Sequence, residues 1–574
     1  MTTRTLLAFA STFLLSAFGA NLAGAAAAAA ATAAASASAS AATADDSDAV
    51  LAVIQPDAIR ADLRFLSDDL LEGRGIGSRG HQLAAQFIAS QFESLGLSPA
   101  GDHGTYFQDV PLQSSQVNET GSSFTWASGP ARARKSEALK FREDYVLYGN
   151  PGQDDSQVTA PVVFVGFGIT APEQKYDDYK NIDVKGKIVA MVFGAPAFQS
   201  ALKAHYSASW LKRKNAAAHG AVGILTFYDP RLQALYPFEK AVRDLAIPRY
   251  NWLDAGGKPD HYYPELKGNG ALSMAAVEHL LMGSGHTAAQ IFAGAKAGKL
   301  TSFALPASAE IHTVSRRATV HSPNVVAKLE GSDPTLKSQY VVYTAHLDHL
   351  GVSTPVKGDS IYNGTLDNAS GSAEVLEIAR AFSRMPTKPR RSIVFVEVTA
   401  EEAGLLGSDY FASNPTVDRG AIVANINIDE DVMLWPLRDV VAFGAEHSTL
   451  EGVVQQATRR LHVEASPDPV PEQVAFIRSD QYSFVRQGIP SLALFAGFKS
   501  DNPQIKPAEI FETWEQTRYH QPEDDMTQPG LDFEAAAAFT RVGFLCGLYV
   551  AQATERPQWK AGDFFGATFA PKGP

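Results

Sequence analysis

The sequence predicts an α/β fold with a mainly parallel sheet flanked by helices, together with a smaller β-rich unit. Residues 340–345 and 392–398 are short apolar and β-branched runs, which are typical of buried strands. Between them, residues 371–385 place apolar side chains on one side of a helix, and Pro386 stops it. Strand, helix and strand in this order form a crossover unit, the usual building block of a parallel sheet.

Metal-seeking side chains follow these predicted strands. His346 comes directly after the first run, and Glu401 and Glu402 follow the second. Asp429 follows a third apolar run at 421–428, while His520 lies downstream of a fourth at 489–495. Ligands of open α/β sheets bind at the carboxyl ends of the strands, so residues far apart in the sequence are expected to meet at one rim. The candidate ligands are His346, Asp367, Glu402, Asp429 and His520.

Imidazole and carboxylate groups are suitable zinc ligands, and a catalytic zinc site leaves a position open for water. Two metals about 3.5–4 Å apart hold the attacking water and the carbonyl oxygen of a scissile amide. Side chains of the adjacent Glu401 and Glu402 diverge, so one can bind metal while the other accepts a proton from the attacking water. Asp348 and Asp524 lie close in sequence to the two histidines and are expected to orient their rings.

Five strings of the chain resemble the M28 family of co-catalytic zinc peptidases and occur in the family's order. They are His346-Leu-Asp-His-Leu-Gly351, Asn363-Gly-Thr-Leu-Asp-Asn-Ala-Ser-Gly371, Thr399-Ala-Glu-Glu-Ala-Gly-Leu-Leu-Gly-Ser408, Asn427-Ile-Asp429 and Tyr519-His520. The resemblance implies the zinc exopeptidase fold, two Zn²⁺ ions per chain and peptide substrates. It further implies a role for each site residue. Asp367 bridges the metals, His346 and Asp429 bind one ion, and Glu402 and His520 bind the other. Glu401 is the general base, and Tyr519 donates a hydrogen bond to the oxyanion.

Two departures from the family pattern concern substrate preference. Glu430 and Asp431 follow Asp429 where the family usually continues with an apolar residue, so negative charge is expected near the metals. Gln481 replaces the histidine of a segment that often reads Ser-Asp-His. The role of His349 remains open between a part in the metal site and a structural part in shaping the loop.

The amino terminus predicts a secretory signal peptide over residues 1–25, because Arg4 precedes an apolar run at 6–20 and Ala23-Gly-Ala25 offers a small-residue cleavage site. An uncleaved anchor helix is the alternative. Residues 26–50 are an Ala/Ser-rich linker. We therefore expect a secreted or periplasmic protein without stable membrane insertion after cleavage. Cys546 is the single cysteine, so no internal disulfide is possible, and it is expected in the core.

The rest of the chain divides into a peptidase domain and an insert. Residues 51–145 are assigned to the amino-terminal part of the peptidase domain, 302–555 to its catalytic core and 556–574 to a tail. Between them, residues 146–301 carry glycine-punctuated strand-like runs and resemble the protease-associated (PA) domain of many M28 enzymes. The insert is interpreted either as a spacer or as a lid. The string Gly75-Ile-Gly-Ser-Arg-Gly80 matches a dinucleotide motif, but no predicted strand leads into it.

A net charge of −13 without clustered Lys and Arg argues against nucleic-acid binding. The sequence therefore predicts a di-zinc exopeptidase, and an aminopeptidase in particular, since an acidic rim suits a substrate ammonium. A carboxypeptidase is the alternative, with Arg478 as the candidate grip on a terminal carboxylate. A receptor-like binding protein is disfavoured because the ligands and base are all present. A single-zinc glutaminyl cyclase is disfavoured because both histidines and the bridging aspartate are complete.

Overall fold

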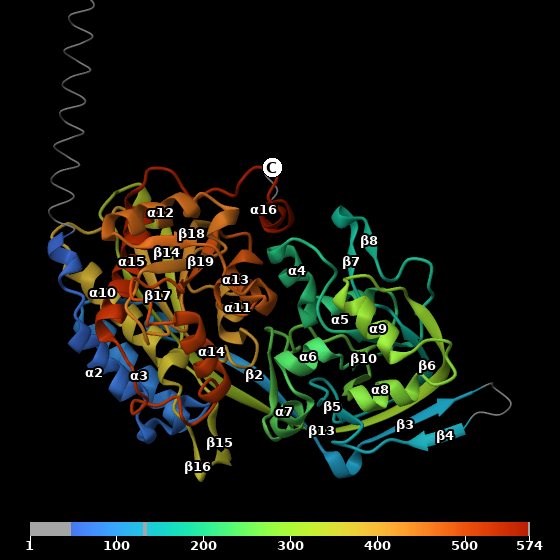
Figure 1. Ribbon diagram of the computed structural model, residues 1–574. Helices are drawn as coiled ribbons and strands as arrows, with labels where there is room; N and C mark the ends of the chain where they lie inside the picture. The colour runs from blue at the N-terminus through green and yellow to red at the C-terminus, as the bar shows by residue number, and fades with distance from the viewer. Residues whose placement is uncertain (1–47, 130–134, 572–574) are drawn as a thin grey trace, which may run out of the picture.

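The computed structural model describes residues 48–129 and 135–571, which form two lobes (Figure 1). The predicted signal peptide and nearly all of the predicted linker lie outside the described residues. One lobe holds the helices and strands that carry the candidate ligands, and we call it the peptidase unit. The other lobe is built mainly from residues between Ser123 and Val314, and we call it the inserted unit.

The sheet of the peptidase unit confirms the predicted fold class. Its four central strands are parallel, in the order β17–β14–β18–β21, with β13 and β19 antiparallel on either side and β20 parallel to β19. Strands β17 and β18 are buried along their whole length, as expected for a sheet covered on both faces. The strands are β14 (Tyr340–His346), β17 (Ser392–Val398), β18 (Ile422–Ile428), β19 (Asp439–Phe443), β20 (Glu464–Ser466) and β21 (Ser491–Ala496).

Helices cover both faces of this sheet. One layer contains α2 (Pro56–Leu66), α3 (Arg79–Ser94), α10 (Ser370–Ser383), α12 (Leu450–Leu461) and α15 (Phe533–Gln552). The opposite face carries α11 (Leu406–Ser413) and α13 (Gln481–Val485). Among the described residues, α15 is the one helix long and apolar enough to span a membrane. It packs against α10, α2 and β14, with Cys546 fully buried as predicted, so it is a core helix of this unit.

The inserted unit is a mixed sheet with helices on its surface. Its strand order is β4–β3–β13–β6–β9–β10–β12–β5, and β6, β9, β10 and β12 are parallel. The strands are β3 (Ser123–Ser128), β4 (Lys135–Ala138), β5 (Tyr145–Leu147), β6 (Asp155–Phe164), β9 (Ile188–Val192), β10 (Gly223–Phe227) and β12 (Gly268–Leu272). The helices are α4 (Ser200–Ser207), α5 (Ser209–Ala218), α6 (Pro230–Leu235), α7 (Phe238–Arg243), α8 (Met274–Leu280) and α9 (Ala288–Lys296). Its hydrophobic core runs from Phe124 to Ile311, beyond both ends of the predicted 146–301 insert.

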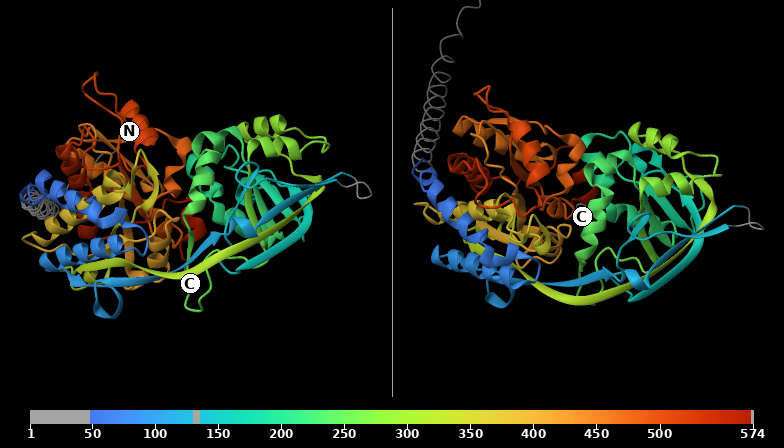
Figure 2. Two further views of the ribbon diagram at one scale, coloured as in Figure 1. Left: turned by 90° about the horizontal axis from the view of Figure 1, so that it is seen from below. Right: turned by 60° about the horizontal axis from the view of Figure 1, so that its bottom comes forward.

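One strand belongs to both units. β13 (Phe303–Leu329) pairs with β3 and β6 through residues 303–314, and with β2 (Phe107–Val117) through residues 315–325. Figure 2 shows this long strand running beneath both lobes. β11 (Arg249–Trp252), which lies within the predicted insert, also pairs with β2. The two lobes are therefore joined by continuous backbone hydrogen bonding as well as by side chains.

The glycine-rich segment at 75–80 serves packing, in agreement with the sequence analysis. It follows a short 3₁₀ turn and leads into α3, whose amino end is capped by the Ser78 side chain. A Cβ on Gly80 would lie 1.6 Å from the Leu71 carbonyl oxygen, so only glycine fits at this position. The segment therefore binds the protein's own backbone rather than a dinucleotide.

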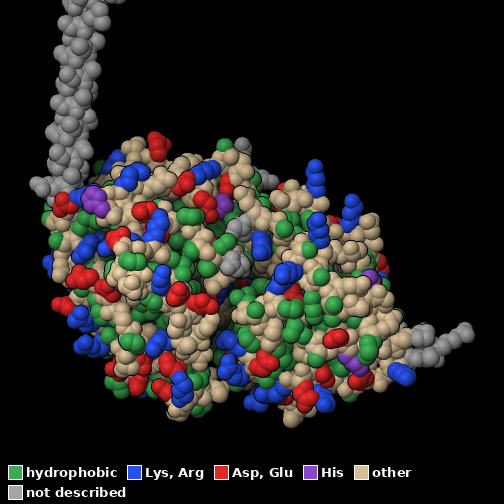
Figure 3. Space-filling view, in the orientation of Figure 1, with side chains coloured by type: hydrophobic (Ala, Val, Ile, Leu, Met, Phe, Trp, Pro, Cys, Tyr) green, Lys and Arg blue, Asp and Glu red, His purple; other side chains and the backbone are tan. Residues whose placement is uncertain are grey.

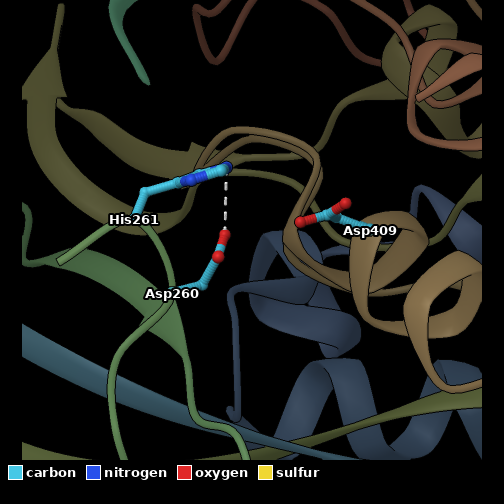
Figure 4. Close-up of side chains that lie close together, drawn as sticks. All are labelled: Asp260, His261 and Asp409. Atoms are coloured by element: carbon cyan, nitrogen blue, oxygen red, sulfur yellow. Dashed lines mark ion pairs between the residues drawn. The ribbon is translucent and has the colours of Figure 1, made fainter. Parts of the chain in front are cut away.

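A polar cluster joins the units on the side of α11 and α13. Figure 4 shows Asp260 and His261 of the inserted unit facing Asp409 of α11. Their ligand-type atoms lie within 4.8 Å of one another, a spacing that a metal ion could use. However, the Arg486 guanidinium already supplies positive charge there, 2.8 Å from Asp409 Oδ1 and 3.3 Å from His261 Nε2. Trp252 also donates to Asp409, at 2.9 Å. The cluster is therefore an ion network between the units.

This network predicts a pH-dependent stability. Burial and the neighbouring Asp409 raise the pKa of Asp260 to about 7. The folded protein therefore keeps this proton up to about pH 7, whereas the unfolded chain loses it near pH 4. The stability contributed by the group is full below pH 4 and is lost as the pH rises through 7. Asp260→Asn removes this loss, so its melting temperature should rise relative to wild type between pH 5 and 8, by roughly 2–4 °C for each kcal/mol of linked free energy. A difference in melting temperature between the two proteins that does not change with pH would contradict the raised pKa of Asp260.

Candidate metal centre

The carboxyl edge of the parallel sheet collects the candidate ligands. His346 ends β14, Asp429 directly follows β18, and Glu402 lies in the loop after β17. Asp367 lies in a short π-helical turn, Thr365–Ala369, just before α10. His520 follows α14 (Pro507–Thr517). The structure thus brings all five predicted ligands to one place.

The ligands form two groups that share Asp367. His346 Nε2 lies 3.2 Å from Asp367 Oδ1 and 3.1 Å from Asp429 Oδ1. His520 Nε2 lies 3.1 Å from Asp367 Oδ2 and 3.2 Å from Glu402 Oε2. The two oxygens of Asp367 therefore face different groups. This is the geometry that a carboxylate bridging two ions requires.

His349, which the sequence left open, lies inside the second group. Its Nδ1 is 2.5 Å from Glu402 Oε1 and 3.7 Å from Asp367 Oδ2, and its side chain is fully buried. The ring is 5.7 Å from that of His520. His349 is therefore a further nitrogen donor next to the second group, and its position three residues after His346 was the available signal. His447 belongs to neither group, and its Nδ1 lies 2.7 Å from Asp563 Oδ2.

Four non-glycine residues in the loops that carry the ligands have left-handed backbone conformations. Ala400, Leu405, Glu430 and His520 are non-glycine residues with φ values of 57°, 63°, 52° and 56°. Such conformations cost free energy and persist only where the surroundings enforce them, which is common at functional sites. Each of these residues is a ligand or lies within three residues of one, so the loops that carry the site hold part of the backbone strain.

Two acidic residues expected to orient histidine rings have different contacts. His346 Nδ1 lies 3.0 Å from the backbone carbonyl of Asp348, whereas the Asp348 carboxylate is 4.0 Å away and accepts the Glu401 N–H at 3.1 Å. The expected carboxylate contact is therefore replaced by a carbonyl contact.

Asp524 likewise accepts the N–H groups of Leu366 and Asp367 at 3.1 Å, rather than bonding His520. It consequently fixes the turn of the shared Asp367.

Other residues that hold the ligands in place were not predicted from the sequence. Ser479 donates a short hydrogen bond to Asp429 Oδ2 and accepts one from Asn427 Nδ2 at 2.6 Å. Buried Arg74 donates to the carbonyls of Leu347, Asn363 and Gly364 at 2.7–2.9 Å. Arg74 was not predicted because these three partners lie more than 270 positions away in the sequence.

The charges of the site are mutually dependent. Burial lowers the pKa of His346 and of His520, but the neighbouring carboxylates outweigh it and raise the pKa of His520 to about 10 and that of His346 well above its usual value. Burial raises the pKa of Glu401, and Asp429 adds to this effect. Without metal, protonated histidines thus balance the carboxylates. Two divalent cations would displace these protons and lower the pKa of Glu401.

The site opens into a cavity. His346, Asp367, Glu401 and Asp429 lie at its polar end, together with Glu430. Its wall is largely aromatic: Trp435, Phe443, Phe495, Phe498, Phe511 and Trp514. Tyr519, the predicted oxyanion donor, lines the cavity next to Arg478, whose Nη2 lies 3.4 Å from the tyrosine oxygen.

The donor set fits zinc. The donors are imidazole nitrogens and carboxylate oxygens, which zinc prefers. Asp367 Oδ2 and Glu402 Oε1 lie close to histidine nitrogens, yet neither accepts a hydrogen bond of normal geometry. Atoms that converge without hydrogen-bond alignment are expected where side chains point at a shared ion.

Figure 3 shows acidic and basic side chains interspersed on the face it displays, without a continuous basic surface there.

An open α/β sheet with two imidazole–carboxylate groups sharing one aspartate at its carboxyl edge places the chain among the zinc exopeptidase folds. Residues 324–543 match peptidase family M28. The predicted resemblance to this family is thereby confirmed over these residues.

Individual proteins agree with this classification. The chain is 31% identical over 175 residues to leupeptin-inactivating enzyme 1 of Streptomyces exfoliatus, covering 30% of this chain and 36% of that protein. It is 26% identical over 315 residues to a glutamate carboxypeptidase 2 homolog of Caenorhabditis elegans, covering 48% and 38%. The chain thus spans little more than a third of these relatives. The fold matches an aminopeptidase from Aneurinibacillus sp. strain AM-1 with a TM-score of 0.50, 19% identity and coverage of 88% and 95%.

The contacts of Asp524 predict its importance for metal binding. Asp524→Ala should release the turn that carries Asp367 and weaken metal affinity by roughly 10–100-fold while the fold survives. Asp525→Ala is the matched control, because the Asp525 carboxylate accepts from Thr527 of its own turn and not from the turn of Asp367. Competition with a chromophoric chelator measures both affinities. Equal affinity in the two variants would show that Asp524 does not position Asp367.

Proposed function

We propose that the protein is a zinc-dependent aminopeptidase that removes single residues from the amino terminus of peptides. The observation that carries this proposal is the pair of groups sharing Asp367 at the polar end of an apolar cavity, with Glu401 beside them. Zinc ions held by His346, Asp367 and Asp429, and by Asp367, Glu402 and His520, would polarise the scissile carbonyl and activate water.

The chain's own residues supply the remaining chemistry. Glu401 lines the cavity but belongs to neither group, and its backbone is held by the Asp348 carboxylate. It is therefore placed to take a proton from the attacking water and to return it to the leaving amine. The Tyr519 hydroxyl faces the same space and can donate to the developing oxyanion. The aromatic wall excludes water and favours a large apolar side chain on the residue that is removed.

A carboxypeptidase is the second candidate, because Arg478 lines the cavity and is exposed to solvent. An arginine in this position can grip a terminal carboxylate. It is a single guanidinium, however, while the polar end of the cavity carries several carboxylates. This balance of charge favours a substrate ammonium over a substrate carboxylate.

We also propose that the mature chain acts outside the cytoplasm, either secreted or periplasmic. Support comes from the residue pattern of positions 1–25, with Arg4 before an apolar run and small residues at Ala23 and Ala25. The resemblance of the inserted unit to a PA domain belongs to the same proposal. Mass analysis of the exported protein should place its amino terminus near residue 26, and an intact residue 1 would favour an anchor helix instead.

Substitution of each of the two adjacent glutamates should distinguish the general base from the metal ligand. Glu401→Gln should retain about two zinc equivalents per chain but lower kcat by at least ~10²–10⁴, the usual contribution of a positioned general base. Glu402→Gln should instead lose metal, because it removes a donor of the second group. Metal analysis and steady-state kinetics on both variants decide the assignment. Near-normal turnover of Glu401→Gln would exclude it as the base.

The direction of cleavage is tested with one peptide in three forms. The free peptide should be shortened from its amino terminus, acetylation of that terminus should abolish cleavage, and amidation of the carboxyl terminus should leave it unchanged. Mass spectrometry of timed digests identifies the products. Cleavage that survives acetylation and disappears on amidation would replace the aminopeptidase with the carboxypeptidase.

A further inference from the structure

One carboxylate in the cavity has no assigned role. The cavity is lined by five acidic residues: Asp367, Glu401, Asp429, Glu430 and Glu515. The first three are the candidate ligands and base. Glu515 accepts from the Gln473 amide at 3.1 and 3.2 Å. In the described part of the chain, the Glu430 carboxylate has neither an ion pair within 4.0 Å nor a side-chain hydrogen bond.

The backbone of Glu430 is fixed independently of its side chain. Its φ of 52° is the left-handed conformation, which costs free energy for a residue with a Cβ. The Glu430 N–H donates to Asn368 Oδ1 at 3.2 Å, and Asn368 Nδ2 donates to the Ile428 carbonyl at 3.1 Å. Asn368 directly follows the shared ligand Asp367, and Glu430 directly follows the ligand Asp429. The position of Glu430 is therefore tied to both ligand loops.

Its neighbour Asp431 shows that only one of the two acidic residues faces the cavity. Asp431 is buried against Glu374 of α10, and burial raises the pKa of both carboxyl groups. Asp431 is absent from the cavity lining. The expectation that both acidic residues add charge near the metals is thus wrong for Asp431, because the chain turns it into the core.

We propose that Glu430 determines specificity by binding the α-ammonium group of the peptide substrate. This inference rests on the proposed aminopeptidase function and names the residue that would select substrates with a free amino terminus. The α-carbon is bonded to the scissile carbonyl carbon, so the ammonium of an amino-terminal residue must lie beside the ligand loops. Glu430 is the carboxylate available there, and its neighbours on the cavity wall accommodate the apolar side chain. A charge-assisted hydrogen bond to an ammonium is among the stronger contacts a protein can offer.

The remaining charges of the cavity are consistent with this role. Arg478 lies near enough to Glu430 to influence its charge, but the two form no ion pair within 4.0 Å among the described residues. A peptide ammonium can therefore reach Glu430 without first breaking a bond to Arg478. An internal peptide segment has no ammonium and an apolar acyl group has none either, so both would cover the half-buried Glu430 carboxylate without pairing it, at a cost in binding.

The test uses the zinc-loaded full chain and the variant Glu430→Gln. With leucine p-nitroanilide as substrate, KM should rise by ~10–100-fold, the range for losing one hydrogen bond to a charged group. Inhibition by leucinol, which carries the ammonium, should weaken by the same factor. Inhibition by 4-methylpentanol, which lacks it, should stay unchanged. The zinc content should remain that of wild type. Asp431→Asn is the matched control, because it alters the neighbouring acid outside the cavity, and it should behave like wild type.

Several results would overturn the inference. Unchanged KM and unchanged preference for leucinol in Glu430→Gln would show that Glu430 does not bind the ammonium, while cleavage of free but not acetylated peptides would leave the aminopeptidase proposal intact. Loss of zinc in this variant would make Glu430 part of the metal site instead. If Glu430→Gln does not fold, Glu430→Met replaces it, since the family usually carries an apolar residue here. Glu430→Met must then show the same loss of preference for leucinol over 4-methylpentanol.

Discussion

Buried negative charge at the carboxyl edge of the sheet is the constraint on which the rest of the structure depends. Removing carboxylates from water is costly unless opposite charge and hydrogen bonds compensate for it. Here the compensation comes from the histidines, from Arg74 and from backbone N–H groups, and bound cations would complete it. Metal binding and folding of these loops are therefore coupled. The residues concerned are Asp348, Asp367, Glu397, Glu402, Asp429 and Asp480.

The sequence predicted the sheet and the ligands because the same signal specifies both. His346, Glu402 and Asp429 follow apolar runs, and the carboxyl ends of parallel strands are where ligands bind in such sheets. The roles of Asp348 and Asp524 could not be predicted in the same way. Their contacts depend on how loop backbones turn after the strand, and such turns brought a carbonyl to His346 and N–H groups to Asp524. The two acidic residues after Asp429 diverged for the same reason.

The limits of the inserted unit were also hidden from the sequence. Glycine-rich punctuation marks turns, but β13 has no turn where it passes from one sheet to the other. A boundary inside a continuous strand leaves no compositional trace. The return of β11 to the peptidase sheet places Trp252 and Asp260 against α11 and α13. These helices begin within a few residues of Glu402 and Ser479, so the inserted unit contacts the scaffold that supports the site.

The arrangement of charge along the cavity accounts for an exopeptidase better than for an endopeptidase. The ligand groups and Glu430 occupy its polar end, and the aromatic wall continues directly from them. A chain running through the site in both directions would have to pass this wall with its backbone amides unpaired, which is costly in an apolar environment. A terminal residue avoids that cost, because its side chain meets the wall and its charged end meets a carboxylate. In the proposed aminopeptidase that carboxylate is Glu430, which directly follows the ligand Asp429, whereas the side chain of Arg478 is exposed.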